Sequence, residues 1–215
     1  MEVKLIDHTG DDAGIVKAAR VSTAGRESLE STEKRGLIRY LVREKHYSTL
    51  EHNSLTFFIE APIFVAREFM RHRTMSYNET SGRYKELSEH FYYPPEDRPL
   101  VQKGKAADYD LYPGNDYQKR KVEDFTDYAY QTAWYSYQNM LDAGIAREVA
   151  RNVLPVGIYT QFYATTNLRN LLQFLDLRTA DDALWEIRYI ANEMKQLAEP
   201  LFPIAMEAWN EYRAT

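Results

Sequence analysis

Residues 71–84 read RHRTMSYNETSGRY and hold three arginines, a histidine and two serines. They follow directly on PIFVAREFM (62–70), an apolar stretch with helical periodicity. The arginine fork matches carboxylates and phosphates. Ser81, Gly82 and Arg83 add a hydroxyl, backbone N–H groups and a bidentate donor. The stretch therefore indicates a clasp for a small anion, and the alternative of a helix end with solvated charges stays open on these residues alone.

The composition is that of an ordinary globular protein, with 44% hydrophobic and 27% charged residues in a chain of 215. A chain of this length builds one good-sized core, so we expect a single domain over 1–215. The net charge of −5 argues against a nucleic-acid partner, because general nucleic-acid binders neutralise phosphates with a basic surface. Arginine nevertheless outnumbers lysine by 17 to 10, which favours a small anionic ligand.

Some residue types are absent or sparse, and this excludes several kinds of chemistry. The chain has no cysteine, which rules out disulfides, thiolate metal sites and a cysteine nucleophile. Its five histidines show no metal-binding spacing such as HExxH, so we expect no metal. No apolar run reaches the length of a membrane span, and the first residues lack a secretory pattern. These features predict a cytoplasmic protein without a membrane partner.

The periodicity of apolar residues predicts an α+β protein with two or three strands and about seven helices. Strict alternation predicts strands over 1–6 and 54–59. Capping residues and proline place helix starts at Asp11 or Asp12, at Ser31 or Thr32, and at Pro62. Later helices are expected at about 116–142, 144–154, 166–177 and 181–199, with a last turn at 205–212.

The segment 94–114 contains four prolines and two glycines and has little apolar content. A segment of this length and composition predicts a long loop, and such loops are commonly lids or mobile segments. We therefore expect a mobile loop at about 94–114 within the single domain.

The motif at 71–84 resembles the signature of the flavin-dependent thymidylate synthases, the ThyX family. Further matching segments bring the similarity to about residues 15–200: AARVS (18–22), the H-x-S-x-x-EH pattern at 46–52, PIFVAREFMRHR (62–73), AREVARNVLP (146–155) and TTNLRNLLQFLDLR (165–178). The chain departs from the family at Thr49, Glu68 and Gln173, where Pro, Gln, and Asn or His are frequent. The resemblance implies a ThyX-like fold, a small antiparallel sheet packed with helices.

The resemblance also implies an activity, a methyltransferase that converts dUMP to dTMP. Methylene-tetrahydrofolate would donate the carbon, FAD would carry the hydride, and NADPH would be the reductant. Family members are homotetramers with shared active sites, so the resemblance implies the same assembly here. The absence of cysteine fits this family, because the unrelated cysteine-dependent synthases activate uracil through a thiol adduct.

The site residues implied by the resemblance fall into two groups. Those matching flavin-contacting positions are Ser22, His46, Ser48, Glu51, Arg71, His72, Arg73, Asn78, Glu79, Asn167, Arg169 and Gln173. Those matching positions around dUMP are Glu68, Arg71, Glu79, Thr80, Ser81, Gly82, Arg83, Arg151 and Arg178. Arg178 matches the residue at the pyrimidine edge and is the implied catalytic residue, because a cation there stabilises negative charge on the ring.

Other interpretations remain open on the residues alone. Arg151 and Arg178 stand near the ends of predicted helices, where a cation often serves only the helix dipole. His46 and His52 could be structural. Two other functional classes are a non-catalytic flavin- or nucleotide-binding protein and a nucleic-acid-binding module, the second being opposed by the acidic charge.

Overall fold

The computed structural model describes residues 1–32, 34–105 and 108–213, and these form two compact units. The first unit comprises Met1–Ala61, Val65–Glu79 and Gln161–Thr215. The second unit comprises Pro62–Phe64 and Thr80–Thr160. Each unit is described by itself below.

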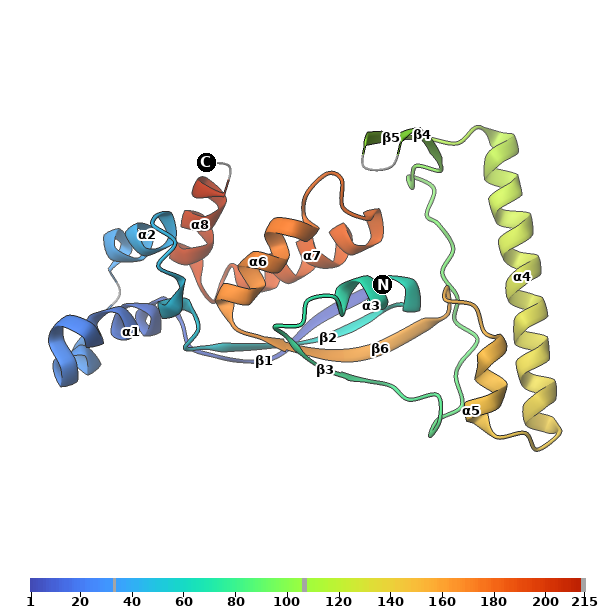
Figure 1. The fold of residues 1–215 in the computed structure, drawn as a ribbon, viewed down its shortest axis with the longest axis horizontal. Coiled ribbons are helices and arrows are strands. Elements are labelled where there is room, and N and C mark those ends of the chain that lie inside the picture. Colours follow the sequence, from blue (N-terminus) through green and yellow to red (C-terminus); the bar gives the residue numbers. More distant parts are fainter. Residues whose placement is uncertain (33, 106–107, 214–215) are drawn as a thin grey trace. The chain divides into compact units, whose positions relative to one another are not determined.

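The first unit is built on a four-stranded sheet in the order β1-β2-β6-β3 (Figure 1). Its strands are β1 (Glu2–Thr9), β2 (Ser54–Pro62), β3 (Ser76–Glu79) and β6 (Tyr159–Thr166). The pairs β1–β2 and β3–β6 are antiparallel. Leu55, Phe57 and Ile59 of β2 alternate with less buried neighbours, as a strand with one covered face requires.

Helices of the first unit cover this sheet, and some of them lie beyond one end of its strands (Figure 1). They are α1 (Asp12–Ala24), α2 (Arg35–Arg43), α3 (Ile63–Phe69), α6 (Leu168–Arg178), α7 (Trp185–Ala198) and α8 (Pro203–Tyr212). Helix α7 packs on β1 and on α6, while α2 packs on α8 (Figure 1). The core between them is apolar and includes Phe69, Phe174 and Trp209, each at most 1% exposed.

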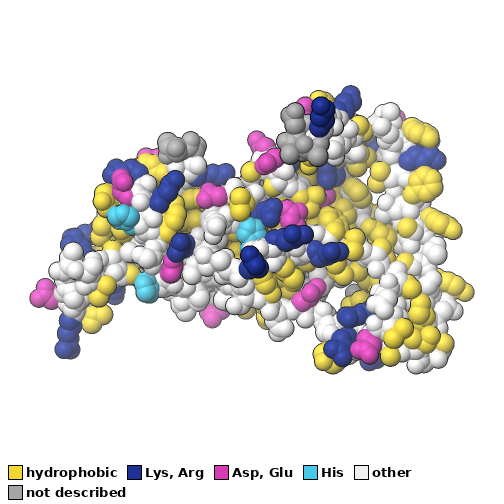
Figure 2. Space-filling view, viewed as in Figure 1, with side chains coloured by type: hydrophobic (Ala, Val, Ile, Leu, Met, Phe, Trp, Pro, Cys, Tyr) yellow, Lys and Arg dark blue, Asp and Glu magenta, His cyan; other side chains and the backbone are white. Residues whose placement is uncertain are grey.

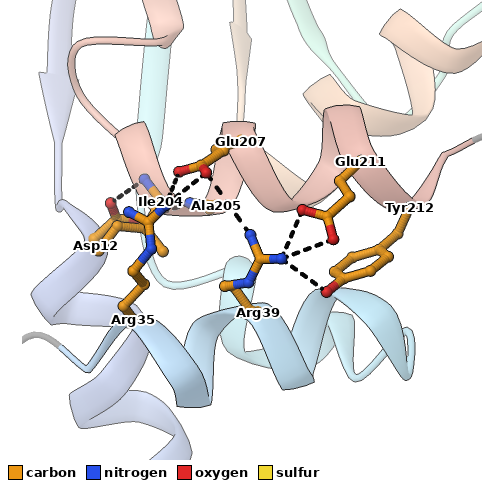
Figure 3. A network of polar contacts seen from close by, with 8 residues as sticks. All are labelled: Asp12, Arg35, Arg39, Ile204, Ala205, Glu207, Glu211 and Tyr212. Carbon is orange, nitrogen blue, oxygen red and sulfur yellow. Dashed lines mark hydrogen bonds and ion pairs between the residues drawn. The ribbon is translucent and has the colours of Figure 1, made fainter.

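A buried carboxylate fixes the start of α8. Asp12 is 2% exposed and accepts hydrogen bonds from the backbone N–H groups of Ile204 (2.7 Å) and Ala205 (3.2 Å) (Figure 3). It therefore satisfies two of the donors that a helix leaves unpaired at its N-terminus. Exposed ion pairs continue along the α2–α8 contact, with Arg35 bonded to Glu207.

The second unit contains a long helix, α4 (Asp116–Asp142), a short one, α5 (Arg147–Ala150), and a hairpin of β4 (Val101–Lys105) and β5 (Asp108–Tyr112). Asn115 and Gln118 form a reciprocal capping box at the start of α4. This box explains the predicted start of the helix at 116, and the predicted end at 142 is confirmed as well.

The predicted α+β class and small antiparallel sheet are confirmed, with eight α-helices in the described part of the chain. The cap at Asp11 is also confirmed, since its carboxylate accepts from Gly14 N–H at 2.7 Å. The expected start of the second helix at Ser31 or Thr32 is wrong, because α2 begins after Lys34. Pro62 ends β2 instead of opening a helix.

Two further expectations need correction. The segment 94–114 is not a plain loop, because β4 and β5 pair within it; residues 106–107 lie outside the described part. The helix at 144–154 is only α5 followed by a 3₁₀ turn over Arg151–Val153. The strands β3 and β6 were not predicted. The mobility of 94–114 stays a prediction.

Neither a membrane-spanning helix nor a metal cluster is found in the described residues. No helix there is both long and apolar enough to cross a bilayer. Likewise, no three His, Asp or Glu side chains of this part converge in a way that could hold a metal ion.

Candidate functional site

Arg178 lies at the C-terminal end of α6 and is held by two other predicted site residues. Its Nη1 donates to Glu68 Oε1 at 2.6 Å, and its Nε donates to His72 Nε2 at 2.9 Å. The side chains of Arg178 and Glu68 are 20% and 27% exposed, so the ion pair is partly shielded from water. The helix α3 and the turn after it thus present an acceptor pair to the last residue of α6.

His72 is neutral in this arrangement. Burial, together with the charge of Arg178, lowers the pKa of His72 from 6.5 to about 4. Because Nε2 accepts from Arg178, the single proton of the neutral ring resides on Nδ1. The ring also contacts Phe174 edge-on, with centroids 4.7 Å apart. His72 therefore orients the guanidinium without adding a second positive charge.

The turn that carries His72 is held by groups that the sequence analysis did not single out. Tyr77 Oη donates to the carbonyl of His72 at 2.7 Å, and burial raises the pKa of Tyr77 to about 12. The amide of Asn170 donates to the carbonyl of Thr74 at 3.2 Å. Residues 71–73 lie in this turn and not in a helix, since α3 ends at Phe69. Side-chain-to-backbone bonds of this kind leave no signal in residue spacing.

A second ion pair joins Glu51 to Arg169 across 118 positions of the chain. Arg169 also lines a cavity of about 470 Å³ with three further predicted flavin residues: Ser22, His46 and Ser48. Hydroxyl, imidazole and guanidinium groups thus surround a space within the first unit. Such a donor set suits a polar, phosphate-bearing cofactor such as FAD.

Asn167 has a structural task. It is the N-cap of α6, and its side chain accepts from Asn170 N–H at 3.0 Å. Asn53, which was not predicted, fixes the same helix start because its Oδ1 accepts from Leu168 N–H at 2.7 Å. The start of α6 is thereby held from two sides, and this positions Arg169 in the first turn.

The Ser81–Arg83 segment belongs to the second unit. Ser81 Oγ accepts from Arg83 N–H at 3.3 Å, and Arg83 Nε donates to Glu148 Oε2 at 2.9 Å. Arg151 packs against Gly82, where an added Cβ would lie 3.2 Å from Arg151 Cδ. The side chain of Arg151 therefore lies close to Gly82, where an added Cβ would be tight, and Gly82 stands between Ser81 and Arg83 in the chain.

Not all predicted site residues are brought together. Within the described part of the chain, the side chains of Arg71, Arg73, Asn78 and Gln173 form no hydrogen bond or ion pair with another predicted site residue. Gln173 is exposed on α6. Thr80 follows β3 directly and is half-buried, and Glu79 ends that strand.

The neutral state of His72 has a consequence for stability. The unfolded chain takes up a proton at the ordinary pKa of 6.5, whereas folded His72 does so only near 4. Stability from this group is therefore lost as the pH falls from about 6.5 to about 4. We expect the wild type to lose more free energy of unfolding over this range than His72→Gln, whose amide oxygen still accepts from Arg178.

The measurement is urea unfolding of both proteins between pH 7 and pH 4.5. His8→Gln, at an exposed position on β1, shows the effect of removing a histidine elsewhere. A wild-type-minus-H72Q difference that does not change with pH would contradict the assignment.

Comparison with known proteins places the chain among relatives along nearly its whole length. The family described as Thymidylate synthase complementing protein matches residues 4–204. A flavin-dependent thymidylate synthase of Streptomyces avermitilis is 46% identical, with 97% of this chain and 90% of the relative covered. The corresponding protein of Pseudothermotoga lettingae is 40% identical, with 98% and 90% covered.

A solved structure agrees with these relatives. The UMP/dUMP methylase PolB from Streptomyces cacaoi, bound with 5-Br dUMP, superposes with a TM-score of 0.92 at 44% identity. The match covers 98% of this chain and 95% of PolB. Both units described above lie largely inside the family match. The chain belongs to the family of flavin-dependent thymidylate synthases.

Proposed function

We propose that the protein catalyses the reductive methylation of dUMP to dTMP. The observation that carries the proposal is the oriented, partly shielded Arg178, held by Glu68 and His72 in a chain of this family. A fixed cation of this kind is suited to stabilise negative charge that develops on a uracil ring. The similarity to a methylase whose structure holds a dUMP analogue supports the same substrate.

FAD is the proposed cofactor, with methylene-tetrahydrofolate as carbon donor and NADPH as reductant. The cavity of about 470 Å³ beside Ser22, His46, Ser48 and Arg169 has the size and donors for part of a flavin nucleotide. When bound, the flavin would supply the hydride chemistry that amino-acid side chains lack. The remaining flavin-contacting residues proposed are Glu51, Arg71, His72, Arg73, Asn78, Glu79, Asn167 and Gln173.

We propose that one group of residues binds the phosphate of dUMP and another contacts its pyrimidine ring. Ser81, Gly82, Arg83 and Arg151 bind the phosphate, because they combine two guanidinium groups with a hydroxyl and backbone donors. Arg178 faces the pyrimidine, with Glu68 as its neighbour. Arg71, Glu79 and Thr80 complete the proposed dUMP contacts.

The chain's own groups have three tasks in this scheme. They bind the anionic ends of the ligands, orient the ring beside Arg178, and keep His72 neutral so that Nε2 remains an acceptor. Positioning of this kind can contribute about 7–11 kcal/mol to lowering a bimolecular barrier. The chain has no cysteine, so no thiol adduct can activate the ring. We also propose that the protein acts in the cytoplasm.

The central test follows the folate product. With dUMP, methylene-tetrahydrofolate, FAD and NADPH, we expect dTMP and tetrahydrofolate, because reduced flavin supplies the hydride. Chromatography identifies the folate. Stoichiometric dihydrofolate, or turnover without a reductant, would refute the mechanism. A protein that binds FAD but never forms dTMP would instead be a non-catalytic flavin-binding protein.

A pair of variants separates phosphate binding from ring activation. Arg83→Ala should weaken dUMP binding by about 1.5–3 kcal/mol, the usual cost of a lost charged hydrogen bond. Glu148→Gln should strengthen it, because Glu148 competes for the Arg83 guanidinium. Arg178→Ala should lower kcat more than it raises KM, since its charge is most useful once the ring is anionic.

Steady-state kinetics with dUMP distinguish these effects. Arg188→Ala serves as the control, because Arg188 lies on α7 and pairs at 3.6 Å with Asp181, an exposed residue of the turn before that helix. Equal losses of affinity and rate in the Arg83 and Arg178 variants would remove the distinction.

We further propose a homotetramer with shared active sites. The support is the large exposed apolar surface of α4, where hydrophobic side chains line the helix (right in Figure 2). Tyr117, Phe125, Tyr128 and Tyr135 are each at least 63% exposed, and monomers rarely leave so many aromatic rings in water. Light scattering should give about four times the chain mass of 25.2 kDa. A fully active monomer would refute the assembly.

A further inference from the structure

A second cavity of about 260 Å³ lies within the first unit, between the end of α2 and the end of α8. Its apolar floor includes Val42 and Trp209, which are 2% and 1% exposed. Three cationic side chains line it: Arg43, Lys45 and Arg213. We refer to this space as the basic–aromatic cavity.

The cationic groups outnumber the single carboxylate of the cavity. Asp176 is the acidic lining residue, and its Oδ1 is engaged by the indole N–H of Trp209 at 2.8 Å. Arg213 lies over the Trp209 ring, with its guanidinium carbon 4.6 Å from the centroid. Neither Arg213 nor Lys45 has an acidic partner within ion-pair distance among the described residues. Arg43 is paired with Glu44 at 2.8 Å, so the excess positive charge beside the buried aromatic surface comes from Lys45 and Arg213.

Lys45 stands at a backbone position that normally selects glycine. Its φ of +57° makes it the one non-glycine residue with positive φ in the described part of the chain. Lys45 N–H donates to the carbonyl of Val42, and His46 N–H donates to the carbonyl of Leu41, which is the Schellman pattern at the end of α2. A lysine here adopts a conformation that costs stability, and strain of this kind is common at binding sites.

The same lysine links two cavities. Lys45 and Tyr47 line both the basic–aromatic cavity and the larger cavity of Ser22, His46 and Arg169. If one end of a long co-substrate reacts with a flavin bound in the larger cavity, its other end must bind to a neighbouring part of the surface. The basic–aromatic cavity offers a neighbouring space with cations for anionic groups and aromatic surface for a flat ring.

We propose that the basic–aromatic cavity binds the acidic tail of the folate co-substrate, an aromatic amide that ends in carboxylates. Lys45 and Arg213 pair with the carboxylates, and the aromatic ring of the tail lies against Tyr47 and Tyr212. This assignment rests on the proposed function. The cationic side chains beside an aromatic surface would also suit the phosphates of a nicotinamide dinucleotide, which is the competing ligand for this cavity.

The test compares methylene-tetrahydrofolate with its pteroate analogue, which lacks the glutamate. Arg213→Gln should raise the KM of the complete folate about fivefold, the upper range for a partly exposed ion pair, and leave that of the analogue within a factor of about two. Asp176→Asn should lower the KM of the complete folate, because it removes the opposing charge while its amide oxygen still accepts from Trp209. Lys119→Ala, at an exposed position on α4, is the control for loss of one cation.

Several outcomes would overturn the proposal: equal effects of Arg213→Gln on both folates, no effect on either, or an effect confined to the KM of NADPH. Lys45→Gly gives a check that does not depend on the stability of R213Q. Glycine suits the left-handed position, so the melting temperature should not fall, while the KM of the complete folate should rise. FAD titration of each variant separates a flavin effect from a folate effect.

Calorimetry with p-aminobenzoylglutamate separates the two proposals. If the wild type makes no dTMP but binds this probe in an Arg213-dependent manner, the proposed function fails and the assigned ligand class of the cavity stands. If dTMP forms but the probe does not bind, or binds equally to Arg213→Gln, the cavity assignment fails alone.

Discussion

A guanidinium that is largely withdrawn from water must find partners, and the first unit is arranged to give Arg178 two of them. Glu68 pairs with its charge through Nη1, and His72 accepts a hydrogen bond from its Nε–H. Desolvation makes an unmatched charge in this position costly, so loss of either acceptor would disturb the end of α6. The constraint reaches His72 itself, because the imidazole can accept only while it is neutral, and its burial beside Arg178 keeps it so.

This arrangement depends on backbone that is pinned on both sides. The turn after α3 is held by the hydroxyl of Tyr77, and the start of α6 is held by Asn53 and by the cap of Asn167. Rigid supports of this kind fix a functional side chain more closely than packing alone. Asp12 has a similar role at α8, whose last residues border the basic–aromatic cavity. Side-chain-to-backbone bonds therefore position most of the groups discussed above.

The sequence predicted the elements whose signals are local. The range 116–142 has a capping box and no internal breaker, so both of its ends were found. Strand β6 was missed because its buried face consists partly of Thr160, Ala164 and Thr166, which hide the apolar alternation. Strand β3 has only four residues and its burial is irregular. The helix start predicted at Pro62 was wrong because proline is tolerated both at the end of a strand and in the first turn of a helix.

The candidate site was less accessible to sequence reasoning, for a physical reason. Glu51 and Arg169 are 118 positions apart, and only the fold brings their charges together. Family resemblance identified both residues without predicting that they pair. Asn167 illustrates the converse, because a residue expected at the flavin also obeys the local rule for an N-cap. A single residue can thus belong to a family motif and also cap the N-terminus of a helix.

The carboxylate of Glu68 changes what Arg178 can offer to a ligand. The family resemblance sets this chain apart at Glu68, where a glutamine is expected; a neutral amide would leave the charge of Arg178 unpaired, whereas here Glu68 pairs with it at 2.6 Å. The pair is nearly neutral overall, so a neutral uracil can be seated without a large desolvation cost. Stabilising an anionic ring is harder, because Glu68 opposes part of the field of Arg178. In the proposed function, Arg178 therefore combines a charge that Glu68 partly offsets with donors whose orientation Glu68 and His72 fix.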